Sequence, residues 1–250
     1  MSSAEAVRQK VLFLTPQLPY PPDQGAAIRN YNLIRYAAQW CRVDLLSFAP
    51  QNADLRPMKA LCHRVCAVPA PSRSRRERLA ALLTSSLPDM AWRLYSEAFA
   101  HALEEMLASQ RYNIIQIEGI EMAPYGLMAR DLVGGLSPKI VYDAHNAEYL
   151  LQRRAFETDL RHPRRWLSAG YSLIQWHRLV RFERYVCRSV NAVIAVSEAD
   201  AAALRPWCRE APLVLPNGVD TSRYHLTLGD TLPLEHPAIV FTGKMDFRPN

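Results

Sequence analysis

Lys10–Thr15, with the sequence KVLFLT, decides the fold class of this chain. Four consecutive apolar residues stand between a lysine and a threonine, a run that is typical of a central β-strand buried on both faces. A parallel sheet offers such a position because helices cover both of its faces. A proline-rich loop follows the strand, and Ala26–Trp40 then carries apolar residues at a spacing that predicts a helix packed on the sheet.

Strands and helices alternate along the rest of the chain. We expect further strands at Val43–Phe48, Val65–Val68, Asn113–Ile117, Lys139–Ala144, Asn191–Val196 and Leu213–Leu215. Between them we expect two helices within Arg75–Gln110, separated at Pro88 and Asp89, a long helix from about Pro163 to Arg188, and a short helix at Glu198–Leu204. This alternation predicts a Rossmann-like α/β fold, a parallel sheet with helices on both faces.

The chain is expected to divide into two lobes. Val214–Asp220 (VLPNGVD) is typical of a strand end followed by a Pro/Asn/Gly turn, the composition of a hinge. Residues 237–250 then begin with an apolar strand, a glycine turn and basic residues. We therefore predict an N-terminal lobe over residues 1–215, a linker over 216–236, and the first strand of a truncated second lobe over 237–250.

The composition is that of an ordinary soluble globular protein, with 250 residues, of which 49% are hydrophobic and 22% charged. The sequence holds no uninterrupted run of eighteen apolar residues, and its N-terminus has no apolar signal segment. We therefore expect a cytoplasmic protein, located at the inner face of the cell membrane if it binds lipid. The five cysteines are scattered, and Cys62, His63 and Cys66 lack a second pair of ligands, so we predict neither a disulfide framework nor a metal site.

The formal charge of +6 is concentrated in one segment, Arg153–Arg188, which contains nine arginines and three acidic residues among apolar and aromatic side chains. Such cations attract phosphate, whether it belongs to a nucleic acid, an anionic lipid or a sugar nucleotide. Two interpretations stay open: a helix packed on the core with a cationic outer side, and a helix lying on an anionic membrane surface. The sequence carries no nucleic-acid recognition module, so we expect no nucleic-acid partner.

Ligands of open α/β sheets bind beyond the carboxyl ends of the strands, so the residues that follow each strand are the candidates for a site. The loop Thr15–Arg29 ends at Gly25 immediately before a helix, where backbone amides can approach an anion. A plain connection between strand and helix is the alternative.

The segment Asp143–Tyr149 (DAHNAEY) places Asp143, His145, Asn146 and Glu148 directly after a strand. Four polar groups cannot all be buried there without partners, which favours a site. In the alternative interpretation, Asn146 or Asp143 caps a helix and His145 is a structural histidine.

Two further strand ends carry polar residues. Ser197–Asp200 (SEAD) is explained by helix capping alone. Gly243–Asn250 places Lys244 and Arg248 after a strand, and two cations beside a glycine suit a pyrophosphate, whereas solvated surface charges are the alternative.

In order and spacing, five segments resemble the retaining glycosyltransferases of family four, which have the two-lobed GT-B architecture. The segments are PYPPDQGAAIRNYNL (20–34), AHNAEY (144–149), NAVIAVSEADAAAL (191–204), VLPNGVD (214–220) and FTGKMDFRPN (241–250). They extend over nearly the whole chain. Within the family, the chain resembles the bacterial sugar transferases of exopolysaccharide biosynthesis, including those that accompany PEP-CTERM/exosortase systems.

The resemblance implies transfer of a hexosyl group from a nucleotide sugar to a glycan or polyprenyl-linked acceptor, with retention of configuration and without a metal or another cofactor. It places His145 in the catalytic centre near the transferred sugar, Gly25 near the donor phosphates and Lys244 on the pyrophosphate. It implies that Arg29 helps to hold the acceptor or a phosphate, and from their places after strands we expect Asn146, Glu148 and Arg248 to bind substrate as well. Preorganised donors and cations suit this chemistry because charge builds up on the departing diphosphate.

The family's second lobe normally supplies a paired-glutamate motif and the nucleotide contacts, so we expect this 250-residue chain to be inactive by itself. The alternative is a non-catalytic half of a split glycosyltransferase that binds the acceptor or the membrane. The sequence excludes two other enzyme classes. The loop after Lys10–Thr15 has prolines where the dinucleotide-binding motif of a Rossmann dehydrogenase needs its first glycines. The G-x-S-x-G motif of a serine hydrolase does not occur.

Overall fold

The computed structural model of the chain describes residues 8–134, 138–221 and 239. It contains a seven-stranded sheet in the order β3-β2-β1-β4-β5-β6-β7, and every neighbouring pair of strands is parallel. The strands are β1 (Lys10–Thr15), β2 (Arg42–Phe48), β3 (Arg64–Val68), β4 (Ile114–Glu118), β5 (Lys139–Ala144), β6 (Ala192–Ala195) and β7 (Leu213–Val214). The predicted parallel α/β fold is confirmed.

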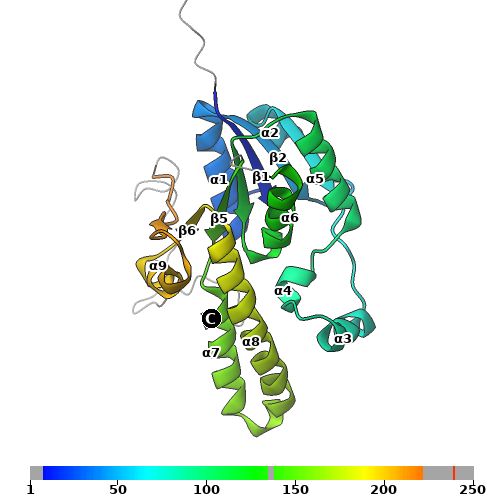
Figure 1. The fold of residues 1–250 in the computed structure, drawn as a ribbon, viewed down its shortest axis with the longest axis vertical. Helices are drawn as coiled ribbons and strands as arrows, with labels where there is room; N and C mark the ends of the chain where they lie inside the picture. Colours follow the sequence, from blue (N-terminus) through cyan, green and yellow to red (C-terminus); the bar gives the residue numbers. More distant parts are fainter. Residues whose placement is uncertain (1–7, 135–137, 222–238, 240–250) are drawn as a thin grey trace, which may run out of the picture. The chain divides into compact units, whose positions relative to one another are not determined.

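Helices connect the strands on both faces of the sheet (Figure 1). They are α1 (Gly25–Trp40), α2 (Arg56–Leu61), α3 (Arg75–Thr84), α4 (Asp89–Trp92), α5 (Glu97–Ser109), α6 (Ala123–Val133), α7 (Glu148–Leu160), α8 (Trp166–Ser189) and α9 (Glu198–Leu204), with three short 3₁₀ turns, η1 (Ile120–Met122), η2 (Pro163–Arg165) and η3 (Arg205–Trp207). Within these described ranges, no helix combines the length and the apolar character needed to cross a membrane.

The central strand β1 has the double-sided burial that its sequence predicts. Leu12 and Leu14 belong to the core on one face, with residues of α5, α6 and α8. Val11 and Phe13 belong to the core on the opposite face, with Ile34 of α1 and Met58 of α2. Because successive strand residues point to opposite faces, an apolar run without alternation can be buried only between two layers of helices.

Three helical segments differ from the sequence-based expectation. Three helices rather than two occupy residues 75–110, because Ser96 starts a new helix: its hydroxyl accepts a hydrogen bond from the Phe99 N–H at 3.4 Å. Helices α2, α6 and α7 were not expected. The long helix α8 begins at Trp166, after the turn η2, and not at Pro163.

Helices α7 and α8 pack against each other as an antiparallel hairpin. Since β5 ends at Ala144 and α7 begins at Glu148, the hairpin starts at the carboxyl edge of the sheet and extends away from it (Figure 1).

The chain divides into two units, Met1–Pro216 and Asn217–Asn250, and all the elements named above belong to the first. The predicted boundaries of the linker and second lobe stay predictions, because residues 222–238 and 240–250 lie outside the described residues.

Candidate functional site

The strand order reverses between β1 and β4, since β2 and β3 lie on one side of β1 and β4 to β7 lie on the other. In a doubly wound sheet, ligands bind beyond the carboxyl ends of the strands at this reversal. Thr15 ends β1 and Glu118 ends β4, and both are completely buried. The hydroxyl of Thr15 has no hydrogen-bond partner among the described residues. The carboxyl edge around these two residues is therefore the first place to look for a site.

A buried ion pair joins α1 to the end of β5. Nη2 of Arg29 donates to both carboxylate oxygens of Asp143, each at 2.9 Å, and Nε donates to Oδ2 at 3.1 Å. Nη1 of Arg29 also donates to the Leu215 carbonyl at 2.9 Å. Burial raises the pKa of Asp143 to about 6, and the charge of Glu118 adds to this effect, whereas Arg29 opposes it. Arg29 therefore links α1 to the end of β5 and to Leu215, which follows β7.

The imidazole of His145 is fixed by Glu118. Nε2 of His145 lies 3.1 Å from Oε2 of Glu118, and the Asn30 amide, oriented with its NH₂ toward the same oxygen, donates to it at 2.8 Å. Burial by itself would lower the pKa of His145, but the hydrogen bond to Glu118 and the charges of Glu118 and Asp143 outweigh it and raise the pKa. The side chain is partly exposed, and Nδ1 has no hydrogen-bond partner in the part of the chain that is described. His145 can therefore offer Nδ1–H to a ligand.

A glycine next to His145 shapes this edge. Gly119 follows β4 with φ of +82° and ψ of 164°, a conformation that is essentially restricted to glycine. A Cβ at this position would lie 2.8 Å from Oε2 of Glu121 and 3.8 Å from Nδ1 of His145. Glu121 in turn is hydrogen bonded to Arg93. The backbone turn after β4 thus approaches the site closely, which a larger residue would prevent.

Glu148, the first residue of α7, has a carboxyl group that is poised near neutrality. Burial raises its pKa to about 7, and the charge of Glu121 contributes, while the hydrogen bond from Nδ2 of Asn146 at 3.1 Å opposes the shift. Near neutral pH, this carboxyl group can therefore accept a hydrogen bond from a ligand or, when protonated, donate one.

The cap of α7 comes from a distant helix. Oε1 and Oε2 of Glu183, on α8, accept hydrogen bonds from the N–H groups of Glu148 and Tyr149 at 3.2 and 3.1 Å. The expectation that Asn146 or Asp143 caps this helix is wrong, because Asp143 is occupied by Arg29 and Asn146 donates to Glu148. Burial raises the pKa of Glu183 to about 8, although the bond from the Tyr149 N–H opposes the shift.

Ser197 caps α9 as predicted, since its hydroxyl accepts from the Asp200 N–H at 3.1 Å. The carboxylate of Asp200 has a second role that the sequence did not indicate. Its Oδ1 accepts a hydrogen bond from the Ala147 N–H at 2.9 Å. The capping motif after β6 therefore also fixes the turn that carries His145 and Asn146.

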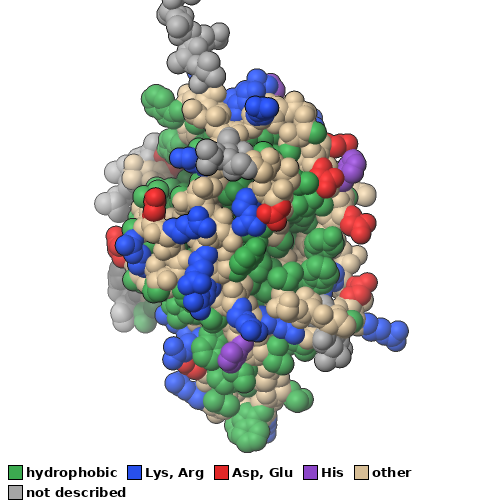
Figure 2. Space-filling model, viewed as in Figure 1, with side chains coloured by type: hydrophobic (Ala, Val, Ile, Leu, Met, Phe, Trp, Pro, Cys, Tyr) green, Lys and Arg blue, Asp and Glu red, His purple; other side chains and the backbone are tan. Residues whose placement is uncertain are grey.

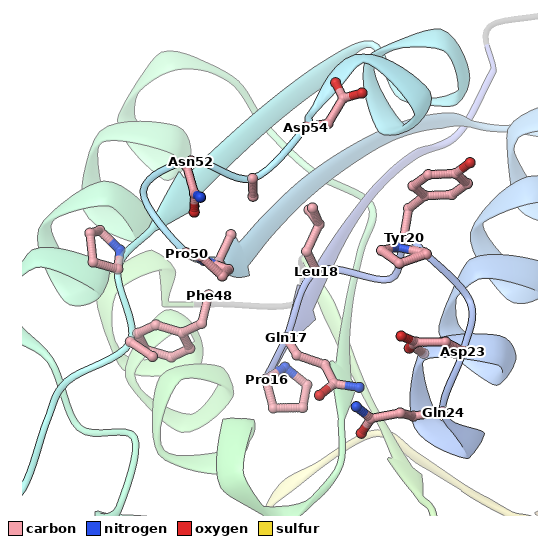
Figure 3. A pocket seen from close by; sticks show the side chains of 16 residues that line it. Pro16, Gln17, Leu18, Tyr20, Asp23, Gln24, Phe48, Pro50, Asn52 and Asp54 are labelled. Atoms are coloured by element: carbon pink, nitrogen blue, oxygen red, sulfur yellow. The ribbon is translucent and has the colours of Figure 1, made fainter.

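The loops after β1, β2 and β3 line an open cavity of about 560 Å³ (Figure 3). Four prolines, Leu18 and Phe48 form much of its wall, and polar groups come from residues such as Gln17, Gln24 and Asn52. The side chains of Gln17 and Gln24 point toward one another (Figure 3). The volume is in the range of small-molecule sites, and a few polar groups in an apolar wall are typical of them.

Gly25 begins α1 at the margin of this cavity, after Gln24 in an extended conformation whose side chain makes no capping hydrogen bond. No atom lies within 4 Å of where a Cβ on Gly25 would be, so the space beside the first turn is open. Arg29 stands one turn further along the same helix and reaches Asp143. The start of α1 therefore lies near the end of β5.

Among the described residues, one group has the composition of a metal site: Glu118, Asp143 and His145 place ligand atoms within 4.8 Å of one another. These atoms already have partners. Both oxygens of Asp143 accept from Arg29, and Oε2 of Glu118 is occupied by His145 and Asn30. A cation here would compete with the buried guanidinium of Arg29, so the arrangement fits a closed ionic network better than a metal centre.

The structure brings together four of the residues predicted from sequence at the carboxyl edge, Arg29, His145, Asn146 and Glu148. Lys244 and Arg248 lie outside the described residues. Sequence reasoning missed Glu118, Gly119 and Glu183. Glu118 and Gly119 could have been found, because they directly follow a predicted strand, but Glu183 stands in the middle of an amphipathic helix and gives no local signal.

Comparison with known proteins gives one family assignment and several distant structural likenesses, two of which are described here. A search of curated proteins found no match. The chain is similar to sucrose-phosphate synthase from Thermosynechococcus elongatus (15% identity, TM-score 0.48, covering 85% of this chain and 91% of that chain). It is also similar to the C-terminal domain of a Pyrococcus furiosus hydrogenase (12% identity, TM-score 0.36, covering 54% and 90%). At these TM-scores the likenesses carry no information on activity.

The model of Glycosyltransferase Family 4 matches residues 24–223, which begin at the start of α1 and include the turns after β4, β5 and β6. The match covers well over half of the chain. This chain therefore belongs to glycosyltransferase family 4.

Proposed function

We propose that this chain forms the acceptor-binding lobe of a retaining GT-B glycosyltransferase, which transfers a hexosyl group from a nucleotide sugar to a polysaccharide or polyprenyl-linked acceptor. The observation that carries the proposal is the placement of His145: a partly exposed imidazole, held by a buried carboxylate, at the carboxyl edge of a sheet within the family match. Assembly of an exopolysaccharide at the inner face of the cell membrane is the process that such a reaction would serve.

His145 is the residue that we place at the reacting centre. Its raised pKa favours the imidazolium form, which keeps a proton on Nδ1 while Nε2–H is directed at Glu118. Nδ1–H then donates a hydrogen bond to a hydroxyl of the transferred sugar or to an oxygen of the leaving diphosphate. A fixed cationic donor stabilises negative charge as it develops, without reorganisation at the moment of reaction.

Donor phosphates bind at the start of α1 in this proposal. The first-turn N–H groups after Gln24 have no side-chain cap, and the open space beside Gly25 admits a phosphate oxygen close to the backbone. That Lys244 and Arg248 bind the pyrophosphate stays a prediction, because both lie outside the described residues. In this proposal no metal is required, because Arg29 compensates Asp143, and His145 and Asn30 occupy Oε2 of Glu118.

The acceptor occupies the cavity beyond β1, β2 and β3. Its apolar prolines and Phe48 suit the faces of a sugar ring or an isoprenoid chain, while Gln17, Gln24 and Asn52 can bind hydroxyl groups. Glu148, with a pKa of about 7, binds a substrate hydroxyl.

The test is a transfer assay on the full-length protein with a panel of nucleotide sugars and a polyprenyl diphosphate sugar as acceptor. We expect one donor to raise the Tm and to give a product whose anomeric configuration, read by NMR, is that of the donor. His145→Ala is expected to abolish transfer while the protein remains folded. An inverted product, or full activity of the His145 variant, would contradict the mechanism.

A further inference from the structure

The end of the α7–α8 hairpin exposes large apolar side chains. Every residue from Leu160 to Leu167, a segment that we call the hairpin tip, is exposed to solvent. Leu167 is 95% exposed, Trp166 62% and Leu160 53%. The space-filling view shows hydrophobic side chains gathered over the end of the hairpin, with basic side chains beside them (Figure 2). Apolar groups gathered at one projecting end indicate a contact surface.

The hairpin tip is also strongly basic. It contains Arg161, Arg164 and Arg165 and no acidic residue. Arg165 lies 3.7 Å from the buried carboxylate of Asp159, but the guanidinium groups of Arg161 and Arg164 have no ion pair or hydrogen bond within the described part of the chain. Two guanidinium groups are thus available to an anionic partner beside three exposed apolar side chains.

One side of α8 is occupied by contacts within the fold. Leu179, Phe182 and Val186 are buried in the core, and Arg178 donates hydrogen bonds to the carbonyls of Leu82 and Leu87. Residues 153–188 therefore form two packed helices joined by a turn, and contact of their outer side with a membrane stays a prediction. Elsewhere on α8, Ile174 and Tyr185 are exposed, but less than Trp166 and Leu167 at the hairpin tip.

We propose that the hairpin tip is a membrane anchor, which inserts Trp166 and Leu167 into the interfacial region of an anionic bilayer and places Arg161 and Arg164 on the headgroup phosphates. Tryptophan is favoured at the level of the headgroups, and arginines near an anionic leaflet add to the binding. A nucleic acid would satisfy the arginines but would leave the side chain of Leu167 in water. An anionic bilayer can bind the arginines and also bury the apolar side chains of the hairpin tip.

This anchor also orients the candidate site. Helix α7 has 13 residues and begins at Glu148, so the site lies about 20 Å from the hairpin tip along the helix axis. Because the hairpin starts at the carboxyl edge of the sheet, insertion of the tip turns that edge toward the membrane (Figure 1). Binding of the hairpin tip to a lipid surface does not depend on the proposed transfer reaction.

The test is flotation of the full-length protein with vesicles of phosphatidylcholine, with and without phosphatidylglycerol, and with no sugar donor or acceptor present. We expect binding to the anionic vesicles. Trp166→Ser with Leu167→Ser should weaken binding at least tenfold, since both side chains lose their place in the interface. Arg161→Ser and Arg164→Ser should each weaken it about fivefold, and added salt should reduce that difference.

Trp40→Ser is the matched control, because Trp40 is 77% exposed at the opposite end of the fold, where α1 leads into β2. It should bind as the unaltered protein does. The inference is overturned if the Trp166/Leu167 variant binds normally, if phosphatidylcholine vesicles bind equally well, or if the protein binds a polyuridine oligonucleotide through the same arginines and ignores vesicles. None of these results depends on transferase activity, so failure here is separate from failure of the proposed function.

Discussion

Arg29 and Asp143 are 114 residues apart in sequence, yet they form a buried ion pair in which three hydrogen bonds of 2.9 to 3.1 Å join guanidinium and carboxylate. The pair lies where the first turns of α1 meet the end of β5. It compensates one of the two buried carboxylates beside His145 and fixes the frame of the candidate site.

Removing the guanidinium should be costly. We expect Arg29→Met to lower the free energy of unfolding by about 3–5 kcal/mol, because it leaves the carboxyl group of Asp143 buried without its partner. Urea denaturation measures the change. Arg56→Met is the control, since Arg56 pairs with Asp54 on the surface and its loss should leave stability unchanged. The double variant Arg29→Met with Asp143→Leu should recover much of the loss.

Stability should fall as the pH rises through neutrality. Glu183 and Glu148 have ordinary pKa values of 4.5 that burial raises to about 8 and about 7. The folded protein therefore holds more protons than the unfolded chain between these values, so the free energy of unfolding decreases from about pH 4.5 to about pH 8. Glu183 alone should contribute on the order of a few kcal/mol.

Glu183→Gln should flatten this pH dependence, because the amide cannot ionise, although its single oxygen replaces only one of the two carboxylate oxygens that accept from the α7 N–H groups. Glu104→Gln, at an exposed position of α5, should leave the slope as it is. The measurement is chemical denaturation at a series of pH values. An unaltered slope in the Glu183 variant would show that this carboxyl group is not the source.

The ionisation of His145 should depend on Glu118. We expect Glu118→Gln to lower the pKa of His145, because the hydrogen bond and charge of Glu118 are what raise it. NMR titration of the imidazole measures the midpoint without reference to activity. If the imidazolium is the active form, the basic limb of the kcat/KM profile should move to lower pH in the same variant, whereas Glu104→Gln should change neither result.

Gly119→Ala should destabilise the fold. Its φ of +82° with ψ of 164° excludes side chains, and the added Cβ would meet Oε2 of Glu121 at 2.8 Å. The expected loss is about 1–3 kcal/mol, measured by urea denaturation. A stability equal to that of the unaltered protein would mean that this turn can relax to another conformation.

Gly25→Ala should act in the opposite way on stability. Gly25 lies in the first turn of α1 with open space around it, so alanine should leave stability unchanged or raise it by up to about 1 kcal/mol. The affinity for the nucleotide sugar should nevertheless fall, since the methyl group occupies the space assigned to a phosphate oxygen. Thermal stabilisation by the donor measures this, and an unchanged donor response would remove Gly25 from the site.

Part of the candidate site could be predicted from the sequence. His145, Asn146 and Glu148 were recognised because polar residues after a buried strand stand where α/β sheets bind ligands, and Gly25 because it precedes a helix. The capping role of Ser197 is equally local and is confirmed. What these side chains contact could not be predicted, since Glu118 comes from the end of β4 and Asp200 from α9, 27 and 53 residues from their partners.

The sequence by itself determined the parallel sheet and its two layers of helices, because an apolar run such as KVLFLT can be buried only there, and hydrophobic pattern is a local property of the chain. Only the tertiary structure decided that Arg29 compensates Asp143, that Glu183 caps α7, and that basic and apolar residues are exposed together at the end of a hairpin. Ion pairs, caps and exposure depend on which segments the strand order and helix packing bring together, and no local pattern specifies this.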